Sequence, residues 1–251
     1  MNRRRLFILT GASRGLGAAI ARKLLAADVH LLTIARKPDK TLADAAHGGV
    51  VEQWSLDLAD DLSATSRLES WLRRHDSSNF STATLINNAG LLGTVGPIDN
   101  MAAEELASVL RVNLEAPMAL AGAFLRATRE WPIERKVLNI SSGAGRNPIA
   151  GWAAYCASKA GLDHFARVTA LDEAREVNGA KIVSLAPGVV ETAMQVQLRS
   201  TDATLFPNKQ HFVDLHANAQ IATPEAGAEK VLAFLARPDF GSNPVADVRS
   251  A

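Results

Sequence analysis

Tyr155 and Lys159 are spaced so that, on a helix, their side chains would lie on one face, one turn apart. Tyr155 is the only tyrosine of the chain. A phenol can give its proton to the alkoxide that forms when a ketone is reduced, but an ordinary tyrosine pKa of about 10 hinders this near neutral pH. We expect the charge of Lys159 to favour the phenolate and to lower the pKa of Tyr155. The spacing alone is a weak signal, because many surface pairs share it.

A serine at the end of a predicted strand could supply a third group. Ser142 follows the apolar run 137–140 and precedes Tyr155 by thirteen residues. A hydroxyl at the carboxyl end of a strand can hydrogen-bond a substrate carbonyl and stabilise an oxyanion. Ser141 is the alternative, and a serine there could also simply cap a turn.

A glycine-rich segment separates the first predicted strand from the first predicted helix. Glycines at such a turn allow a pyrophosphate to approach the backbone, and the helix N-terminus supplies free N–H groups and a positive dipole end. Glycines also make ordinary turns, but the strand before and the helix after favour nucleotide binding. The expected contacts are Gly11, Ser13, Arg14, Gly15, Leu16 and Gly17.

The second predicted strand indicates which dinucleotide binds. An acidic residue about 20 positions beyond the glycines usually binds a free ribose 2′-hydroxyl. Residues 33–37 contain no acid and include Arg36. Arg36 can stack near the adenine and pair with a 2′-phosphate, and Arg14 can face the same group. The alternative is two solvated surface arginines, but we favour NADP(H).

Short apolar runs alternate with longer amphipathic segments. The predicted strands are residues 6–9, 30–35, 50–55, 84–86, 136–140 and 181–185. The predicted helices are residues 16–27, 62–74, 103–128, 152–176 and 223–237. This alternation predicts an α/β fold, a single-domain, Rossmann-type, doubly wound parallel sheet with helices on both faces, spanning residues 1–251. Residues 193–222 are polar and lack clear periodicity, which predicts a long loop that serves as a substrate lid.

The totals limit the other classes of function. The chain has 251 residues, 47% of them hydrophobic, and a net charge of +1, so no nucleic-acid or membrane partner is expected. The single cysteine, Cys156, excludes an internal disulfide, and the six histidines show no metal-ligand spacing, so no metal is expected. The first apolar run is too short for a signal peptide, and we expect a soluble, cytoplasmic protein.

The order of these motifs resembles the short-chain dehydrogenase/reductase family over residues 6–248. The resemblance implies that Ser142, Tyr155, Lys159 and Asn113 are catalytic, with Asn113 holding a water that links Lys159 to solvent. A tolerated polar residue in mid-helix is the alternative for Asn113. Tyr155 and Lys159 would also contact the cofactor. Its other implied contacts are Asp57 and Leu58, Asn88, Ala89 and Gly90, and Pro187, Gly188, Val190 and Thr192.

Within the family, residues 151–159 most resemble sepiapterin reductases and microbial benzil reductases. The match implies that Ser142, Tyr155 and Asp247 contact substrate, although Asp247 could equally be an exposed carboxylate of the tail. Trp152 could line the pocket or anchor the start of its helix. A homodimer or homotetramer formed through the two long helices is also implied.

We therefore predict an NADPH-dependent reductase of a small-molecule carbonyl, either a vicinal dicarbonyl or a pterin side-chain ketone. The pocket segments 91–98, 149–152 and 193–222 are mostly apolar or small, which favours a neutral or aromatic substrate. One alternative is a non-catalytic NADP(H)-binding regulator, which should have lost part of the Ser–Tyr–Lys set. Another is an alcohol dehydrogenase or an epimerase, but the arginine pair favours reduction, and little chain follows Pro187 for an epimerase's substrate domain.

Overall fold

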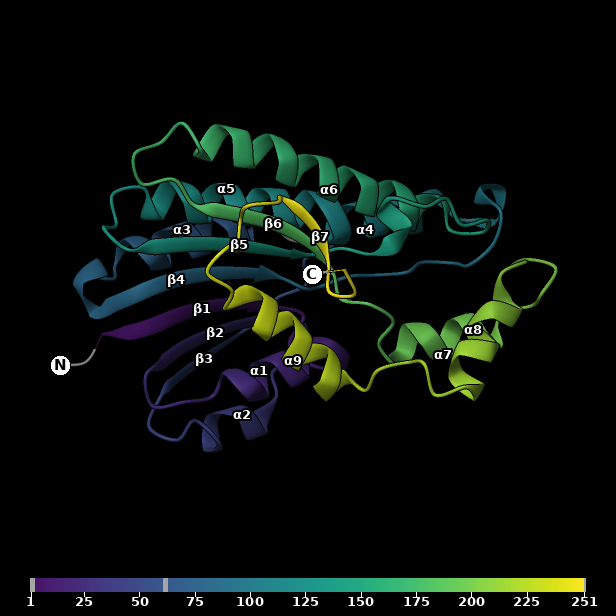
Figure 1. Ribbon diagram of the computed structural model, residues 1–251, viewed down its shortest axis with the longest axis horizontal. Helices are drawn as coiled ribbons and strands as arrows, with labels where there is room; N and C mark the ends of the chain where they lie inside the picture. The colour runs from purple at the N-terminus through teal and green to yellow at the C-terminus, as the bar shows by residue number, and fades with distance from the viewer. Residues whose placement is uncertain (1–2, 61–62, 251) are drawn as a thin grey trace.

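Seven strands form one parallel sheet in the order β3-β2-β1-β4-β5-β6-β7 (Figure 1). The computed structural model describes residues 3–60 and 63–250. The strands are β1 (Arg4–Thr10), β2 (Val29–Ala35), β3 (Val50–Ser55), β4 (Phe80–Asn87), β5 (Glu134–Ile140), β6 (Lys181–Ala186) and β7 (Val245–Asp247). The strand order reverses between β1 and β4, so the cleft at which such sheets bind ligands lies beyond the carboxyl ends of these two strands.

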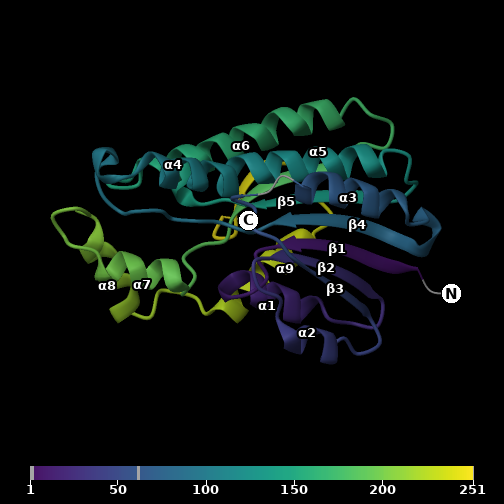
Figure 2. The ribbon, with the colours of Figure 1, turned by 180° about the vertical axis from the view of Figure 1, so that it is seen from behind.

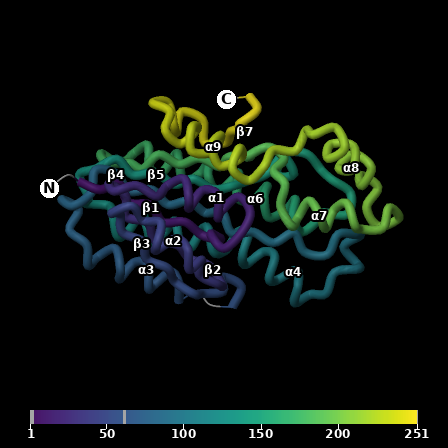
Figure 3. Tube along the Cα trace, turned by 90° about the horizontal axis from the view of Figure 1, so that it is seen from below, coloured from purple at the N-terminus to yellow at the C-terminus, as the bar shows by residue number. Residues whose placement is uncertain are grey.

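Helices cover both faces of this sheet (Figures 1 and 2). On one face lie α3 (Ser63–Arg73), α4 (Ala103–Leu110), α5 (Ala116–Thr128) and α6 (Ala153–Glu173). On the other lie α1 (Gly15–Leu24), α2 (Lys40–Asp44) and α9 (Pro224–Leu235). Two further helices, α7 (Ala193–Ser200) and α8 (Lys209–Ala217), extend beyond the carboxyl ends of the strands, at one end of the molecule (Figure 3).

The central positions of most strands are apolar because both faces of the sheet are buried. Along β1, Leu6 and Ile8 pack into the core beneath α3 and α5, whereas Phe7 and Leu9 pack into the core beneath α1 and α9. The alternation of side chains along a strand sends successive residues to opposite cores. The predicted doubly wound sheet with two covered faces is therefore confirmed.

All six predicted strands are found, with ends at most four residues from those expected, and the helix predicted from residue 223 begins at Pro224. Thr223 is its N-cap, with its hydroxyl accepting a hydrogen bond from the Ala226 amide at 3.2 Å. Residue 62, the expected start of α3, lies outside the described residues. Within the described part of the chain, no helix is long and apolar enough to span a bilayer.

Three local expectations are wrong. Residues 193–222 are not a loop but contain α7 and α8, which bury one side chain each, Leu198 and Phe212, and so give no apolar periodicity in the sequence. The helix predicted over 103–128 is interrupted by a π-helical turn, η3 (Arg111–Glu115). The strand β7 was missed because it has only three residues.

Candidate active site

The glycine turn after β1 is shaped by close backbone packing. Gly11 has a φ of +72°, and a Cβ there would lie 2.8 Å from the Cα of Ala89. A Cβ on Gly17 would overlap the carbonyl oxygen of Gly11. The other expected contacts of the turn are Ser13 and Arg14, which are exposed, Gly15, which has a φ of +55°, and Leu16, which is buried. Arg14 is the N-cap of α1 and its side chain makes no capping hydrogen bond, so the helix N-terminus can receive an anion.

The segment after β4 is hydrogen-bonded directly to this turn. The amides of Asn88 and Ala89 both donate to Thr10 Oγ1, each at 3.0 Å. The side-chain amide of Asn88 donates to the carbonyl oxygens of Thr10 and Gly11, at 3.1 and 3.2 Å. Asn88 thus holds the two strand ends together, whereas sequence reasoning named it only as a cofactor contact and missed Thr10. Gly90 lies deeper, where a Cβ would be 3.9 Å from Lys159 Nζ.

The residues expected at the adenosine end lie at the ends of β2 and β3. Arg36 directly follows β2, and its side chain is 59% exposed. Its Nη1 atom lies 4.0 Å from Asp57 Oδ2, while Asp57 Oδ1 accepts a hydrogen bond from the Ala59 amide. Leu58 is buried in the core. An exposed guanidinium is therefore available beside the glycine-turn edge of the sheet, with no carboxylate at the last position of β2.

Ser142, Tyr155 and Lys159 come together as predicted. Ser142 follows β5 and begins a 3₁₀ turn, with its Oγ accepting a hydrogen bond from the Ala144 amide at 3.2 Å. It also hydrogen-bonds the Tyr155 hydroxyl. Lys159, one turn further along α6, places Nζ 5.7 Å from the Tyr155 ring centroid and donates to the Ile140 carbonyl at 2.8 Å.

The pKa values of this pair differ from the sequence expectation. Burial raises the pKa of Tyr155 to about 12, and the hydrogen bond from Ser142 only partly opposes this. Burial also lowers the pKa of Lys159 to about 8, against the charge of Asp163, which favours the ammonium form. The prediction that Lys159 lowers the pKa of Tyr155 below its ordinary value is therefore wrong, because the same burial disfavours both charged forms.

A buried aspartate that sequence reasoning missed distinguishes Ser141 from Ser142. Asp163 lies one turn beyond Lys159 and is 1% exposed. Its Oδ1 accepts hydrogen bonds from the hydroxyls of Ser141, at 2.5 Å, and Ser184, at 2.7 Å, and Arg146 Nε is 3.5 Å from Oδ2. Ser141 is thereby bound to Asp163, so Ser142 is the serine beside Tyr155. The four-residue spacing of Tyr155, Lys159 and Asp163 was the available signal.

Asn113 lies in the π-helical turn η3 and is fully buried. Its Oδ1 accepts from the Leu91 amide at 2.7 Å, and its Nδ2 donates to the Leu91 carbonyl at 2.7 Å and to Ser158 Oγ at 3.1 Å. The side chain joins three segments around Lys159, so it is not merely a tolerated polar residue. π-Helical turns occur often at functional sites, and here the turn carries Asn113 into the interior.

The segment after β6 reaches over the glycine turn. Pro187 and Gly188, which has a φ of +76°, follow the strand. Val190 forms a parallel bridge with Ala222. Thr192 precedes α7, and its Cγ2 would lie 3.2 Å from a Cβ on Gly15. The expected nicotinamide-side residues therefore lie against the expected phosphate-binding residues.

Trp152 anchors the start of its helix, and its place in a substrate pocket stays a prediction. It precedes α6, is buried, and stacks on Phe206 with ring centroids 5.5 Å apart and planes 8° apart. Phe212 of α8 lies 5.5 Å away, and Tyr155 meets the indole edge-on at 5.6 Å. Trp152 thus packs the α7–α8 region against the start of α6, directly beside Tyr155.

Asp247 is not an exposed tail carboxylate. It ends β7, pairs in register with Ala186 of β6, and its side chain is 11% exposed. Arg249 lies 2.7 Å from its Oδ2, and this hydrogen bond lowers the pKa of Asp247.

The residues at the switch point fit a dinucleotide. The close packing at Gly11 and Gly17 brings backbone amides to the N-terminus of α1, and Arg14 is exposed beside them. At Gly90 and Gly188, an added Cβ would meet its nearest neighbours at 3.6 Å or more, so the backbone is less tightly packed there than at Gly11 and Gly17.

The chain is similar to known short-chain dehydrogenases. The family model described as short chain dehydrogenase matches residues 5–203. A benzil reductase ((S)-benzoin forming) of Bacillus cereus is 37% identical, over 94% of this chain and 96% of its own. A sepiapterin reductase of Rattus norvegicus is 30% identical, over 94% and 92%. A Beutenbergia cavernae structure with NADP bound at low occupancy is 29% identical, with a TM-score of 0.80 over 98% and 95%. This chain therefore belongs to the short-chain dehydrogenase/reductase family, oxidoreductases that bind a nicotinamide cofactor.

Proposed function

We propose that this protein is an NADPH-dependent reductase of a ketone carbonyl, with a vicinal dicarbonyl or a pterin side-chain ketone as its substrate. The observation that carries the proposal is the set Ser142, Tyr155 and Lys159 beside the aromatic group around Trp152. Relatives that are 30–37% identical over more than nine-tenths of this chain are named benzil reductase and sepiapterin reductase, which supports this substrate class.

Ser142, Tyr155 and Lys159 each have a separate role in the proposed reduction. These residues would hold the nicotinamide that supplies a hydride for the carbonyl carbon. Ser142 Oγ hydrogen-bonds the carbonyl oxygen as negative charge develops on it. Tyr155 gives this oxygen its proton, and even a phenol with a pKa of about 12 is a much stronger acid than an alcohol. The ammonium group of Lys159 then stabilises the phenolate that remains, and Asn113 orders the route by which a proton returns.

The cationic side chains at the edge of the sheet support NADPH over NADH. Arg36 occupies the position where a 2′-hydroxyl-binding acid would stand, and Arg14 is exposed at the N-terminus of α1. A 2′-phosphate carries more negative charge than the carboxylate of Asp57, 4.0 Å from Arg36, and would compete with it for the guanidinium.

The substrate region is apolar on the side of α7 and α8, residues 193–222, which we propose as the lid. Leu92, Val95, Trp152, Phe206 and Phe212 form one buried cluster with Tyr155 packed against it. Such a wall suits an aromatic or neutral ketone better than a phosphorylated one. The contact of Asp247 with substrate stays a prediction, and in the structure its carboxylate pairs with Arg249.

We also propose a homodimer or homotetramer that associates through α5 and α6. Met118 on α5 is 42% exposed, and Val168 and Leu171 on α6 are 45% and 70% exposed. Exposed large apolar side chains on two neighbouring helices favour a face that another subunit covers.

Turnover with and without the phenol tests the reaction. NADPH oxidation is followed against benzil, smaller diketones, sepiapterin and simple aldehydes, with wild type, Tyr155→Phe and Ser142→Ala. We expect Tyr155→Phe to lower kcat by about 10²–10⁴ while leaving NADPH binding nearly unchanged. Ser141→Ala is the matched control for Ser142→Ala, since its hydroxyl is bound to Asp163, and it should keep most of the activity.

Each alternative function has its own outcome in this assay. Equal turnover by wild type and Tyr155→Phe would contradict the assigned proton donor. NADPH binding without turnover of any carbonyl would favour a non-catalytic regulator. A higher kcat/KM for NADP⁺ reduction with alcohols than for NADPH oxidation with any of the carbonyls would favour an alcohol dehydrogenase.

A further inference from the structure

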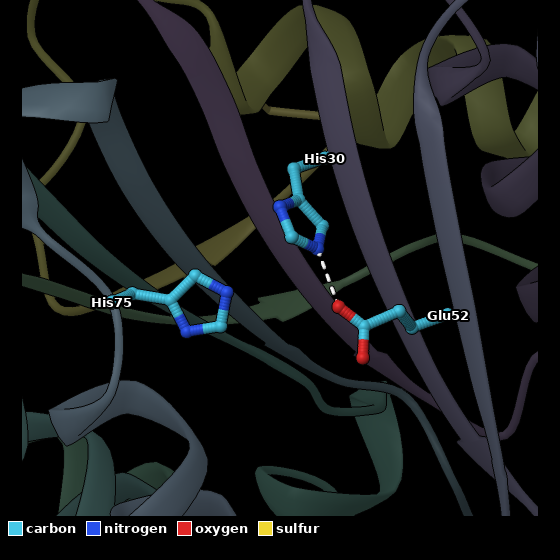
Figure 4. Close-up of side chains that lie close together, drawn as sticks. All are labelled: His30, Glu52 and His75. Carbon is cyan, nitrogen blue, oxygen red and sulfur yellow. Dashed lines mark hydrogen bonds and ion pairs between the residues drawn. The ribbon is translucent and has the colours of Figure 1, made fainter.

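Three side chains with metal-binding chemistry meet at the end of the sheet opposite the active site. His30 is the second residue of β2, Glu52 lies on β3, and His75 follows α3 (Figure 4). Arg36, at the other end of β2, is six residues from His30, or about 20 Å along a strand. The group is therefore separate from the hydride-transfer site.

Their ligand atoms are close enough for one ion. One ring nitrogen of each histidine and one carboxylate oxygen all lie within 4.8 Å of one another. His30 Nε2 is 2.8 Å from Glu52 Oε1. Figure 4 shows the ring of His75 turned toward the other two side chains. A tetrahedral ion with bonds of about 2.0–2.1 Å separates its ligand atoms by about 3.3 Å, so small side-chain movements would suffice.

Hydrogen bonds with Trp71 orient two of the three ligands. The Trp71 carbonyl, which can only accept, lies 2.8 Å from His75 Nδ1, so Nδ1 carries the proton and a neutral His75 presents a lone pair on Nε2. The Trp71 indole donates to Glu52 Oε2 at 3.1 Å and leaves Oε1 facing His30. Metal-binding histidines and carboxylates are usually fixed by outer hydrogen bonds of this kind.

The group is largely enclosed but open to an entering ion. The His30 side chain is 9% exposed. The Glu52 side chain is 37% exposed, so the group opens to solvent on one side. The rings of Trp71 and Phe80 lie 5.5 and 5.9 Å from His30 and lower the local polarity.

We propose that His30, Glu52 and His75 bind a divalent transition-metal ion of the Zn²⁺ type, with water completing the coordination. Two imidazoles and one carboxylate suit such an ion better than Mg²⁺ or Ca²⁺, which prefer oxygen ligands. The ion would join β2, β3 and the connection that leads into β4. Its contribution is to the stability of this edge, since the hydride-transfer groups lie at the other end of the strands.

Cobalt titration of the metal-free, tag-free protein tests the site, because tetrahedral Co²⁺ absorbs strongly in the visible range. We expect one Co²⁺ per chain with such a spectrum, displaced by Zn²⁺. His75→Gln should weaken binding at least about tenfold, and Glu52→Gln should also weaken it while keeping an acceptor for the Trp71 indole. His164→Gln, an exposed histidine on α6, is the matched control and should bind like wild type.

The readouts separate metal binding from folding and from catalysis. Circular dichroism and NADPH binding should be the same for wild type and His75→Gln without metal. Zn²⁺ should raise the melting temperature of wild type and of His164→Gln equally, and that of His75→Gln by less. Equal Co²⁺ binding by wild type and both variants, or no tetrahedral spectrum in the wild type, would overturn the proposal. If His75→Gln does not fold, Glu52→Gln alone decides between these outcomes.

Discussion

Replacing Lys159 by methionine should make the fold more stable while abolishing turnover. Lys159 is 4% exposed, and burial lowers the pKa of its amine from 10.5 to about 8. At pH 7 the group is protonated in both states, and a difference of this size corresponds to about 3 kcal/mol that folding must overcome. Methionine has a similar length and no charge. It gives up the 2.8 Å hydrogen bond to the Ile140 carbonyl, which is worth about 1 kcal/mol.

The net gain is about 2 kcal/mol at pH 7. At about 2.1 cal/mol/K per residue, unfolding 251 residues has an entropy of about 0.5 kcal/mol/K, so the melting temperature should rise by about 4 °C. The folded pKa of Lys159 lies below its unfolded value, so the folded protein binds fewer protons between pH 8 and 10.5. Wild-type stability should therefore gain from this group as pH rises through that window. The advantage of Lys159→Met should be largely lost by pH 10.

Urea unfolding followed by circular dichroism, at pH 7 and pH 10, measures both quantities, and NADPH oxidation measures the loss of activity. Lys230→Met on α9 is the matched control, because Lys230 is exposed, and it should change stability little at either pH. A Lys159→Met protein that is less stable than wild type at pH 7 would refute the reasoning. So would a difference that is the same at pH 10.

Three further substitutions address the cofactor and the lysine. Arg36→Asp should shift the ratio of kcat/KM from NADPH toward NADH by at least about tenfold, because the charge-assisted hydrogen bond to the 2′-phosphate is lost. An unchanged ratio would mean that Arg36 does not bind the 2′-phosphate. Gly17→Ala puts a methyl group against a backbone carbonyl of the glycine turn, and this overlap costs about 1–3 kcal/mol. Calorimetry should therefore show weaker NADPH binding and a lower melting temperature. Normal NADPH binding would contradict the tight packing at Gly17. Asp163→Asn removes a negative charge that raises the pKa of Lys159, so the alkaline limb of the pH–rate profile should move to lower pH. A shift to higher pH would contradict the effect of the Asp163 charge on Lys159.

Local patterns made much of the fold predictable. The glycine turn lies between a buried strand and a helix that are adjacent in the sequence, and both were found where expected. The pair Tyr155 and Lys159 needs only a helix to bring it together. Ser142 could be assigned to the same site only from the order of motifs in the family that the sequence resembles.

What could not be predicted depends on contacts between distant segments. Thr10 and Asn88 are 78 residues apart, and only the pairing of β1 with β4 brings them together. His30 and Glu52 become neighbours through the register of β2 and β3, which aligns His30 with Val50. The pKa of Tyr155 was predicted in the wrong direction because spacing reports a neighbouring charge but not the depth of burial.

The four hydrogen bonds that join Thr10, Gly11, Asn88 and Ala89 also affect how the protein meets its nucleotide. They fix the width of the cleft between β1 and β4 within the protein itself. Ordering two flexible loops upon binding would cost conformational entropy, and this preorganised cleft avoids that cost. More of the interaction energy with the nucleotide therefore remains as affinity, and association should proceed with little rearrangement of the glycine turn.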